Sequence, residues 1–264
     1  MSDLFAPYVE VDGSAVDAGP LLPALMGNYG HMTAMQVRGG RVRGLDFHLA
    51  RLDAATRELF GEGLDGGRVR ERVRRALEGA GVVDADVRVY VHAMGGLDAG
   101  PVATVVVRPP LPEPGAPQRL RSVRYVRPLA HLKHVGSFGQ VYHLRRVRAE
   151  GFDEALLVGP GGEVAEGAIT NVGFVEGDTV IWPEGPSLDG IAMLVLRREM
   201  ERAGLAWRQQ PVRIEELGRF DGAFVCNSIG AAPVSVIDDT RFAVEGRVVG
   251  EVMGLHAAAP WDVI

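Results

Sequence analysis

Lys133 is the residue of this chain best suited to covalent chemistry, because it is the only lysine among 28 basic residues, the rest being arginines. Arginine stays protonated in proteins, whereas a lysine amine that is partly removed from water can lose its proton and attack a carbonyl carbon. Imidazoles flank it at His131 and His134, as expected around a partly desolvated amine. Composition alone also allows a plain surface lysine in an arginine-rich protein.

Other residues have the types and spacing to bind an anionic ligand. A helix expected to begin at Gly190-Ile191-Ala192 would leave backbone N–H groups free, and these groups, with the helix dipole, bind phosphate. Arg51 would offer a charge-assisted hydrogen bond to the same kind of group. Glu166, downstream of a glycine-rich turn, is a candidate acid.

The order and spacing of these features resemble those of the class IV pyridoxal-phosphate aminotransferases. That group includes branched-chain and D-amino-acid aminotransferases and aminodeoxychorismate lyase. The family's G-x-[IV]-x-E-G-x-x-x-N motif is matched at 162–171, and its H-x-x-R-L motif at 48–52. A GFDEALL-like strand at 151–158 follows Lys133 in the family's order. The resemblance extends over about residues 29 to 250, apart from a proline-rich linker.

The resemblance implies a role for each of these residues. Lys133 would hold pyridoxal 5'-phosphate as a Schiff base and would move the alpha proton of the substrate as the catalytic residue. Glu166 would face the pyridine nitrogen and keep the ring protonated, so that the ring accepts electrons from the carbanion. The residues implied to bind the cofactor are Arg51, Lys133, Glu166, Gly190, Ile191, Ala192, Asn227 and Ser228.

The sequence departs from the family at phosphate and substrate contacts. Ala192 and Met193 stand where the family has a hydroxyl residue and an arginine, so the backbone must bind more of the phosphate. Phe138 replaces a tyrosine that bonds the ring oxygen, a contact that Tyr142 could restore. His92-Ala93-Met94 replaces an arginine that binds the substrate carboxylate in two subgroups. The residues expected in the substrate pocket are Met32, Thr33, His92 and Phe138.

The implied function is transfer of an amino group between an amino acid or amine and a 2-oxo acid, both small molecules. An elimination enzyme similar to aminodeoxychorismate lyase is the alternative, favoured by Thr33 and by Cys226-Asn227. A non-catalytic member that binds only the cofactor or a partner protein is a third alternative, motivated by Phe138 and Ala192. The sequence does not determine the amino donor and acceptor, the stereochemistry or the pathway.

Composition and charge argue against several other classes of function. The net charge is −6 and no block of Lys or Arg is present, so the chain lacks the electrostatic footprint of a nucleic-acid or membrane-surface protein. No stretch approaches the ~20 apolar residues of a membrane helix, and the first residues lack the pattern of a signal peptide. Cys226 is the single cysteine, which fits a reducing compartment. We expect a cytoplasmic protein without a metal site, since no cluster of His and Cys with ligand spacing is present.

Apolar periodicity predicts a mixture of helices and short strands. Strands and helices alternate without a regular βαβ rhythm, which indicates the α+β class. Asp46 is the expected N-cap of the first long helix. The helices are expected near 46–60, 68–80, 138–149 and 190–203.

A proline-rich stretch marks the domain boundary. Five prolines between 109 and 117 exclude a helix or a central strand there. The predicted domains are 1–112, an N-terminal α/β sandwich, and 118–264, which binds the cofactor. The family resemblance implies a two-domain fold with the cofactor between the domains, and a homodimer.

Overall fold

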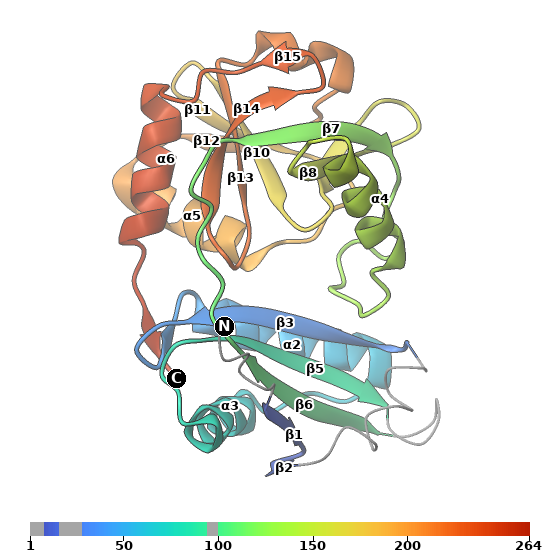
Figure 1. Ribbon diagram of the computed structural model, residues 1–264, viewed down its shortest axis with the longest axis vertical. Helices are drawn as coiled ribbons and strands as arrows, with labels where there is room; N and C mark the ends of the chain where they lie inside the picture. Colours follow the sequence, from blue (N-terminus) through green and yellow to red (C-terminus); the bar gives the residue numbers. More distant parts are fainter. Residues whose placement is uncertain (1–7, 16–27, 94–99) are drawn as a thin grey trace. The chain divides into compact units, whose positions relative to one another are not determined.

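The computed structural model describes residues 8–15, 28–93 and 100–264 and divides the chain into two compact units (Figure 1). Unit 1 contains the described residues up to Pro112, together with Leu132–Gly136 and Pro260–Ile264. Unit 2 contains Glu113–His131 and Ser137–Ala259. Both units combine helices with mainly antiparallel strands, which confirms the predicted α+β class.

Unit 1 is a five-stranded antiparallel sheet with two helices packed on it, in the strand order β2-β1-β6-β5-β3. Val87, Val89 and Val91 alternate along the central strand β5 and are fully buried, as the period of two predicts. Helix α2 contacts β3, and helix α3 contacts β6 and β1. The elements are β1 (Tyr8–Val11), β2 (Ser14–Ala15), β3 (Gly30–Val37), α2 (Leu45–Phe60), α3 (Gly66–Ala80), β5 (Ala85–Ala93) and β6 (Pro101–Arg108).

Helix α2 begins at Leu45, and the carboxylate at its start comes from the far end of the chain. Asp262 Oδ2 accepts a hydrogen bond from the Leu45 N–H at 2.9 Å. Strand β16 (Asp262–Val263) holds this carboxylate in place by pairing with β4 (Arg41–Val42). Asp46 lies in the first turn, after a glycine in the left-handed conformation, so the prediction that it caps the helix was wrong. A local pattern cannot reveal an acceptor that is 217 residues away.

Segment Leu132–Gly136 belongs to unit 1, although the chain before and after it belongs to unit 2. Strand β3 is the last strand of its sheet, and the segment forms an antiparallel bridge along it, with His134 opposite His31. Unit 2 therefore differs from the predicted domain 118–264, which included this segment and Pro260–Ile264. Backbone pairing with a distant strand leaves no local signal in the sequence.

Unit 2 is a nine-stranded mixed sheet that curls on itself. The order is β12-β11-β10-β13-β14-β7-β8-β9, with β15 paired to β14, and β9 also contacts β10 and β11. Helix α4 contacts β8, whereas α5 and α6 contact each other (Figure 1). The strands are β7 (Gln118–Arg124), β8 (Glu154–Val158), β9 (Val164–Gly167), β10 (Asn171–Glu176), β11 (Thr179–Pro183), β12 (Trp207–Gln210), β13 (Gly222–Cys226), β14 (Ala231–Ile237) and β15 (Thr240–Arg241). The helices are α4 (Phe138–Ala149), α5 (Ile191–Ala203), the short 3₁₀ helix η2 (Ile214–Arg219) and α6 (Arg247–Ala258).

The four predicted helices are confirmed, but α6 and β14 were not predicted. Gly250 and Gly254 weaken the helical signal of α6, and Pro233 interrupts the strand signal of β14. Pro233 is tolerated because β14 pairs with β7 only from Val234 onward. Within the described ranges, no helix combines the length and the apolar character needed to cross a bilayer.

Candidate functional site

Lys133 is placed in unit 1 by backbone hydrogen bonds to β3. Its carbonyl oxygen accepts the Met32 N–H at 2.9 Å, and the Val135 N–H donates to the Gly30 carbonyl at 3.0 Å. Gly30 has no room for a side chain, because a Cβ there would lie 2.3 Å from the Val91 carbonyl oxygen. The lysine is half-buried, and its positive charge helps to lower the pKa of His48.

Unit 1 also brings together the predicted residues Thr33 and Arg51. Arg51 Nη2 donates to Thr33 Oγ1, and the same hydroxyl lies 2.6 Å from His48 Nδ1. Thr33 and His48 are buried, and both His48 and Arg51 come from α2. Burial, with the positive charges of Arg51 and Lys133, holds the pKa of His48 well below its usual value. His48 is therefore neutral at pH 7, and Arg51 and Lys133 supply positive charge that suits an anionic ligand.

The other substrate-pocket candidates of unit 1 are more dispersed. Met32 is half-buried and contributes its backbone N–H to Lys133. His92 is buried near the end of β5, where its Nε2 lies 2.8 Å from Thr104 Oγ1, and burial lowers its pKa. Met94 lies outside the described residues. No three His, Cys, Asp or Glu side chains group as metal ligands in the described part of the chain.

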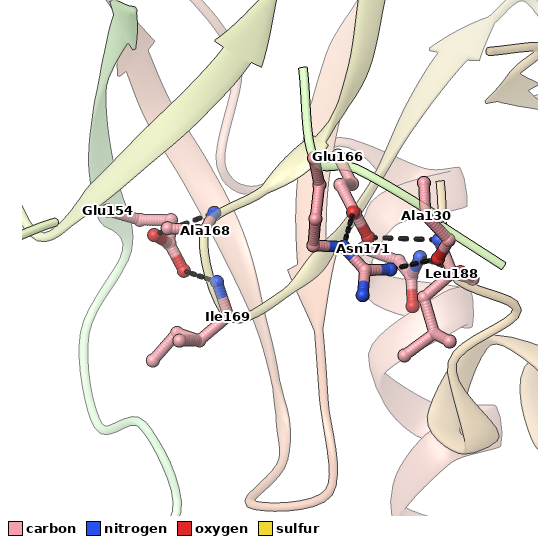
Figure 2. A network of polar contacts seen from close by, with 8 residues as sticks. Ala130, Glu154, Glu166, Ala168, Ile169, Asn171 and Leu188 are labelled. Carbon is pink, nitrogen blue, oxygen red and sulfur yellow. Dashed lines mark hydrogen bonds and ion pairs between the residues drawn. The ribbon is translucent and has the colours of Figure 1, made fainter. Parts of the chain in front are cut away.

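In unit 2, Glu166 is a buried acid paired with an arginine that the motif does not contain. Arg127 Nε donates to Glu166 Oε1 at 2.9 Å, and the exposed fractions of the two side chains are 4% and 7%. Arg127 Nη2 also donates to the Ala130 carbonyl. Glu166 Oε2 accepts the Leu188 N–H at 3.1 Å (Figure 2). The Glu166 side chain is therefore paired and hydrogen-bonded at both oxygens, as a buried acid requires.

The same network fixes the start of helix α5. Asn171 Nδ2 donates to the Leu188 carbonyl at 2.8 Å, so both motif residues, Glu166 and Asn171, hold the loop before the helix (Figure 2). Any side chain at Gly190 would clash with Asn171, because a Cβ there would lie 1.9 Å from Asn171 Oδ1. No side chain caps α5, whose first residue is Ile191, so the N–H groups of its first turn have no acceptor within the helix.

Two positions where the family has polar side chains are apolar and buried here. Ala192 and Met193 pack in a core cluster with Leu196 and Trp182. They therefore offer no side-chain donor, as the sequence indicated. The donors at this end of α5 are backbone N–H groups, which attract anions together with the helix dipole.

The turn after β13 carries the predicted residues Asn227 and Ser228. The Asn227 amide donates to the Ile169 carbonyl at 3.2 Å, and its Oδ1 accepts the Ile229 N–H at 2.8 Å. The Asn227 side chain therefore shapes this turn and ties it to the turn that follows Glu166. Ser228 is half-buried within the same turn.

Phe138 begins helix α4 and is 83% exposed. Its ring stacks on Tyr142 with a centroid distance of 6.1 Å. The Tyr142 hydroxyl accepts a hydrogen bond from Arg146 Nη1 at 3.4 Å on the same helix.

Two buried charged residues, Arg127 and Glu154, were not predicted to belong to the site. Glu154 accepts hydrogen bonds from the N–H groups of Ala168 and Ile169 at 3.2 and 3.3 Å (Figure 2). It also accepts one from the Thr170 hydroxyl at 3.2 Å. It thus fixes the turn between the two motif residues Glu166 and Asn171. Arg127 is one arginine among many, so it had no distinguishing signal in the sequence. Glu154 lies in the GFDEALL-like strand that supports the family resemblance, but no site role was assigned to it.

Burial raises the pKa of Glu154 to about 7, against the lowering effect of its hydrogen bonds. Because the folded protein binds this proton more tightly than the unfolded chain, the stabilisation is full below pH 4.5 and is lost as the pH rises to about 7. We expect Glu154 to lower the free energy of unfolding by up to about 3 kcal/mol across this range. Urea denaturation of wild type and Glu154→Gln at several pH values measures the effect.

Comparison of the two proteins isolates the contribution of Glu154, because several histidines change the stability with the opposite sign. Burial and Arg51 lower the pKa of His31 to about 4, and the pKa of His48 is also lowered, so these residues destabilise the fold as the pH falls below 6.5. Glu163→Gln, at an exposed glutamate of the same hairpin, is the control and should parallel wild type. Parallel curves for wild type and Glu154→Gln would show that Glu154 does not titrate in this range.

The fold and sequence were compared with those of known proteins. The family model "Amino-transferase class IV" matches residues 30–237. A search of curated proteins gave no match. Among solved structures, a hypothetical aminotransferase from Mycobacterium tuberculosis in its PLP-bound form has a TM-score of 0.81 at 21% identity, covering 96% of this chain and 98% of that one.

Two further structures show the same fold. The branched-chain aminotransferase from the thermophilic archaeon Thermoproteus uzoniensis, with norvaline, has a TM-score of 0.83 at 20% identity, covering 95% of this chain and 93% of that one. A putative 4-amino-4-deoxychorismate lyase from Legionella pneumophila has a TM-score of 0.83 at 17% identity, covering 90% of this chain and 94% of that one. Identities this low establish only the fold, but the family model covers most of the chain. The chain belongs to the class IV aminotransferases, a family of enzymes that use pyridoxal phosphate.

Proposed function

We propose that this protein is a pyridoxal-phosphate-dependent aminotransferase that moves an amino group between an amino acid or amine and a 2-oxo acid. One observation carries the proposal: the buried acid Glu166 and the uncapped start of helix α5 belong to one hydrogen-bonded network through Leu188. The acid suits a protonated pyridine nitrogen, and the helix start suits a phosphate.

The residues present fit this cofactor. The first-turn N–H groups of α5, beginning with that of Ile191, have no intrahelical acceptor and suit a phosphate. Arg51 and Lys133 bring positive charge for a phosphate and an amine for an aldehyde. We assign cofactor binding to the residues that the sequence indicated, namely Arg51, Lys133, Glu166, Gly190, Ile191, Ala192, Asn227 and Ser228.

When bound, pyridoxal phosphate supplies an electron sink for the carbanion that forms at the substrate alpha carbon. Lys133 Nζ would hold the cofactor, and the free amine would take the alpha proton of the substrate and return it. Glu166 would hold the proton of the ring nitrogen. Arg127 Nε, at 2.9 Å from Glu166 Oε1, pairs with this acid and holds it in place.

An elimination similar to that of aminodeoxychorismate lyase is the second candidate. The presence of Thr33 in the same unit as Lys133 supports it. A non-catalytic member that binds only the cofactor or a partner protein is the third. The two enzymes both use Lys133, so the test must distinguish the fate of the amino group.

A half-reaction with amino donors tests the proposal. Addition of an accepted amino acid should convert the bound cofactor to its amine form, seen as a loss of the long-wavelength absorbance, and a 2-oxo acid should restore that absorbance. Release of pyruvate from aminodeoxychorismate without the amine form would support the lyase. A cofactor spectrum that no amine or amino acid changes would support the non-catalytic member.

Lys133→Ala should abolish both the absorbance shift that accompanies cofactor attachment and the half-reaction, because the chain has no other lysine. Lys133→Arg is the matched control, since it keeps the positive charge but cannot act as a nucleophile. Equal losses in the two variants indicate amine chemistry rather than a charge effect. A wild-type half-reaction in Lys133→Arg would rule out this residue as the nucleophile.

Glu166→Gln should leave cofactor attachment largely intact but slow removal of the alpha proton by about 10²-fold, because a ring nitrogen without its acid is a poor electron sink. Single-turnover absorbance with a deuterated and an undeuterated donor measures this step. Glu163→Gln, the same change at an exposed position in the adjacent turn, is the control and should keep the wild-type rate. A wild-type rate in Glu166→Gln would contradict the assigned role.

We also propose a cytoplasmic homodimer, as the family resemblance implies. The exposed, stacked rings of Phe138 and Tyr142 offer an apolar surface suited to a second copy. Phe138→Asp should therefore reduce the sedimenting mass towards that of one chain. Val83→Asp, at an exposed apolar residue of unit 1, should leave the mass unchanged. A monomeric wild type would refute the proposed dimer.

A further inference from the structure

A directed chain of hydrogen bonds leads from Arg51 to a buried histidine. Arginine carries only donors, so Thr33 Oγ1 accepts the hydrogen bond from Arg51 Nη2. A hydroxyl has one proton, and Thr33 makes no further side-chain hydrogen bond within the described residues. That proton therefore points to His48 Nδ1, at 2.6 Å.

The direction of the hydrogen bond from Thr33 to His48 determines the protonation state of the imidazole. Its Nδ1 must be the unprotonated nitrogen of a neutral imidazole, with the proton on Nε2. Burial and the nearby charges of Arg51 and Lys133 lower the pKa of His48, so the ring keeps this acceptor at neutral pH. All three hydrogen-bonded residues lie in regular secondary structure. Thr33 belongs to β3, and His48 and Arg51 belong to α2.

In a second histidine–threonine pair of the same unit, the histidine donates the hydrogen bond and the threonine accepts it. Thr56 donates its hydroxyl proton to the Leu52 carbonyl at 2.7 Å, so Thr56 Oγ1 accepts from His31 Nε2 at 3.0 Å. No arginine takes part in this pair. The arrangement that includes Arg51 is therefore particular to Thr33 and His48, and Thr56 provides a matched comparison.

We propose that Thr33 and His48 are positioning residues that hold the guanidinium of Arg51 in the plane in which it binds the phosphate of the cofactor. The inference rests on the proposed function, because it takes Arg51 as a phosphate ligand. A guanidinium binds phosphate through a rigid fork of donors, so fixing one nitrogen on Thr33 fixes the plane of the others. The orientation is set before the ligand arrives, and less side-chain freedom is lost on binding. Thr33, which the sequence placed in the substrate pocket, thereby acts through Arg51.

The test compares two ligands that differ only in the phosphate. Apo-protein is titrated with pyridoxal phosphate and with pyridoxal, and binding is followed by absorbance. Thr33→Val and His48→Leu should each weaken binding of pyridoxal phosphate by about tenfold or more, the effect of losing a hydrogen bond to a charged group. Binding of pyridoxal should not change. Arg51→Met should show the same selectivity with a larger effect.

Conservative variants separate positioning from packing. Thr33→Ser keeps the hydroxyl and should bind like wild type. His48→Asn places its Oδ1 where Nδ1 stood and should restore much of the affinity. His48→Gln places its amide at the Nε2 position and should not. A higher affinity of His48→Asn than of His48→Gln supports the proposal even if His48→Leu fails to fold.

The control is Thr56→Val, which removes the hydroxyl of the His31–Thr56 pair. It should leave the ratio of the affinities for pyridoxal phosphate and pyridoxal unchanged. Thermal unfolding of each apo-variant monitors the fold. If Arg51→Met loses affinity for pyridoxal phosphate but Thr33→Val and His48→Gln do not, positioning is refuted and the proposed function stands. If wild type binds neither ligand, both the function and this inference are refuted.

Discussion

The pairing of residues 133–135 with the edge of β3 is the constraint on which the chemistry of this chain depends. Two backbone hydrogen bonds, from Met32 to the Lys133 carbonyl and from Val135 to the Gly30 carbonyl, place the one lysine in unit 1. The chain on both sides of this segment belongs to unit 2. The position of the amine is therefore set by backbone geometry, and Gly30 permits it by allowing close approach of β5.

Unit 2 contributes a network in which two sequence motifs act as one structure. Glu166 and Asn171 both bind Leu188, so the acid and the start of α5 keep a fixed relation to each other. Two further charged residues support this network, Arg127 from outside the motifs and Glu154 from the GFDEALL-like strand. Arg127 balances the charge of Glu166, and Glu154 holds the turn that connects Glu166 to Asn171. A buried pair of this kind stabilises little by itself, but the loss of either partner is costly.

Apolar periodicity and motif spacing were enough to predict the α+β class and most of the helices. They could not predict contacts between residues that are distant in sequence. Arg127 is 39 residues from Glu166, and its type is the commonest cation of the chain, so no local pattern distinguishes it. Asp262 caps α2 in place of Asp46 for the same reason. Helix α6 was not predicted because its glycines have a low helix propensity. Packing against α5 stabilises this helix, and the local sequence does not reveal that contact.

The central claim is that Lys133 carries the cofactor, and chemical trapping tests it most directly. Protein loaded with pyridoxal phosphate is reduced with borohydride, digested, and mapped by mass spectrometry. Because Lys133 is the only lysine, the only other amine of the chain is its terminal one. A phosphopyridoxyl group on the peptide that contains Lys133 is the predicted result. A group found only at the terminal amine, or no modification at all, would contradict the claim.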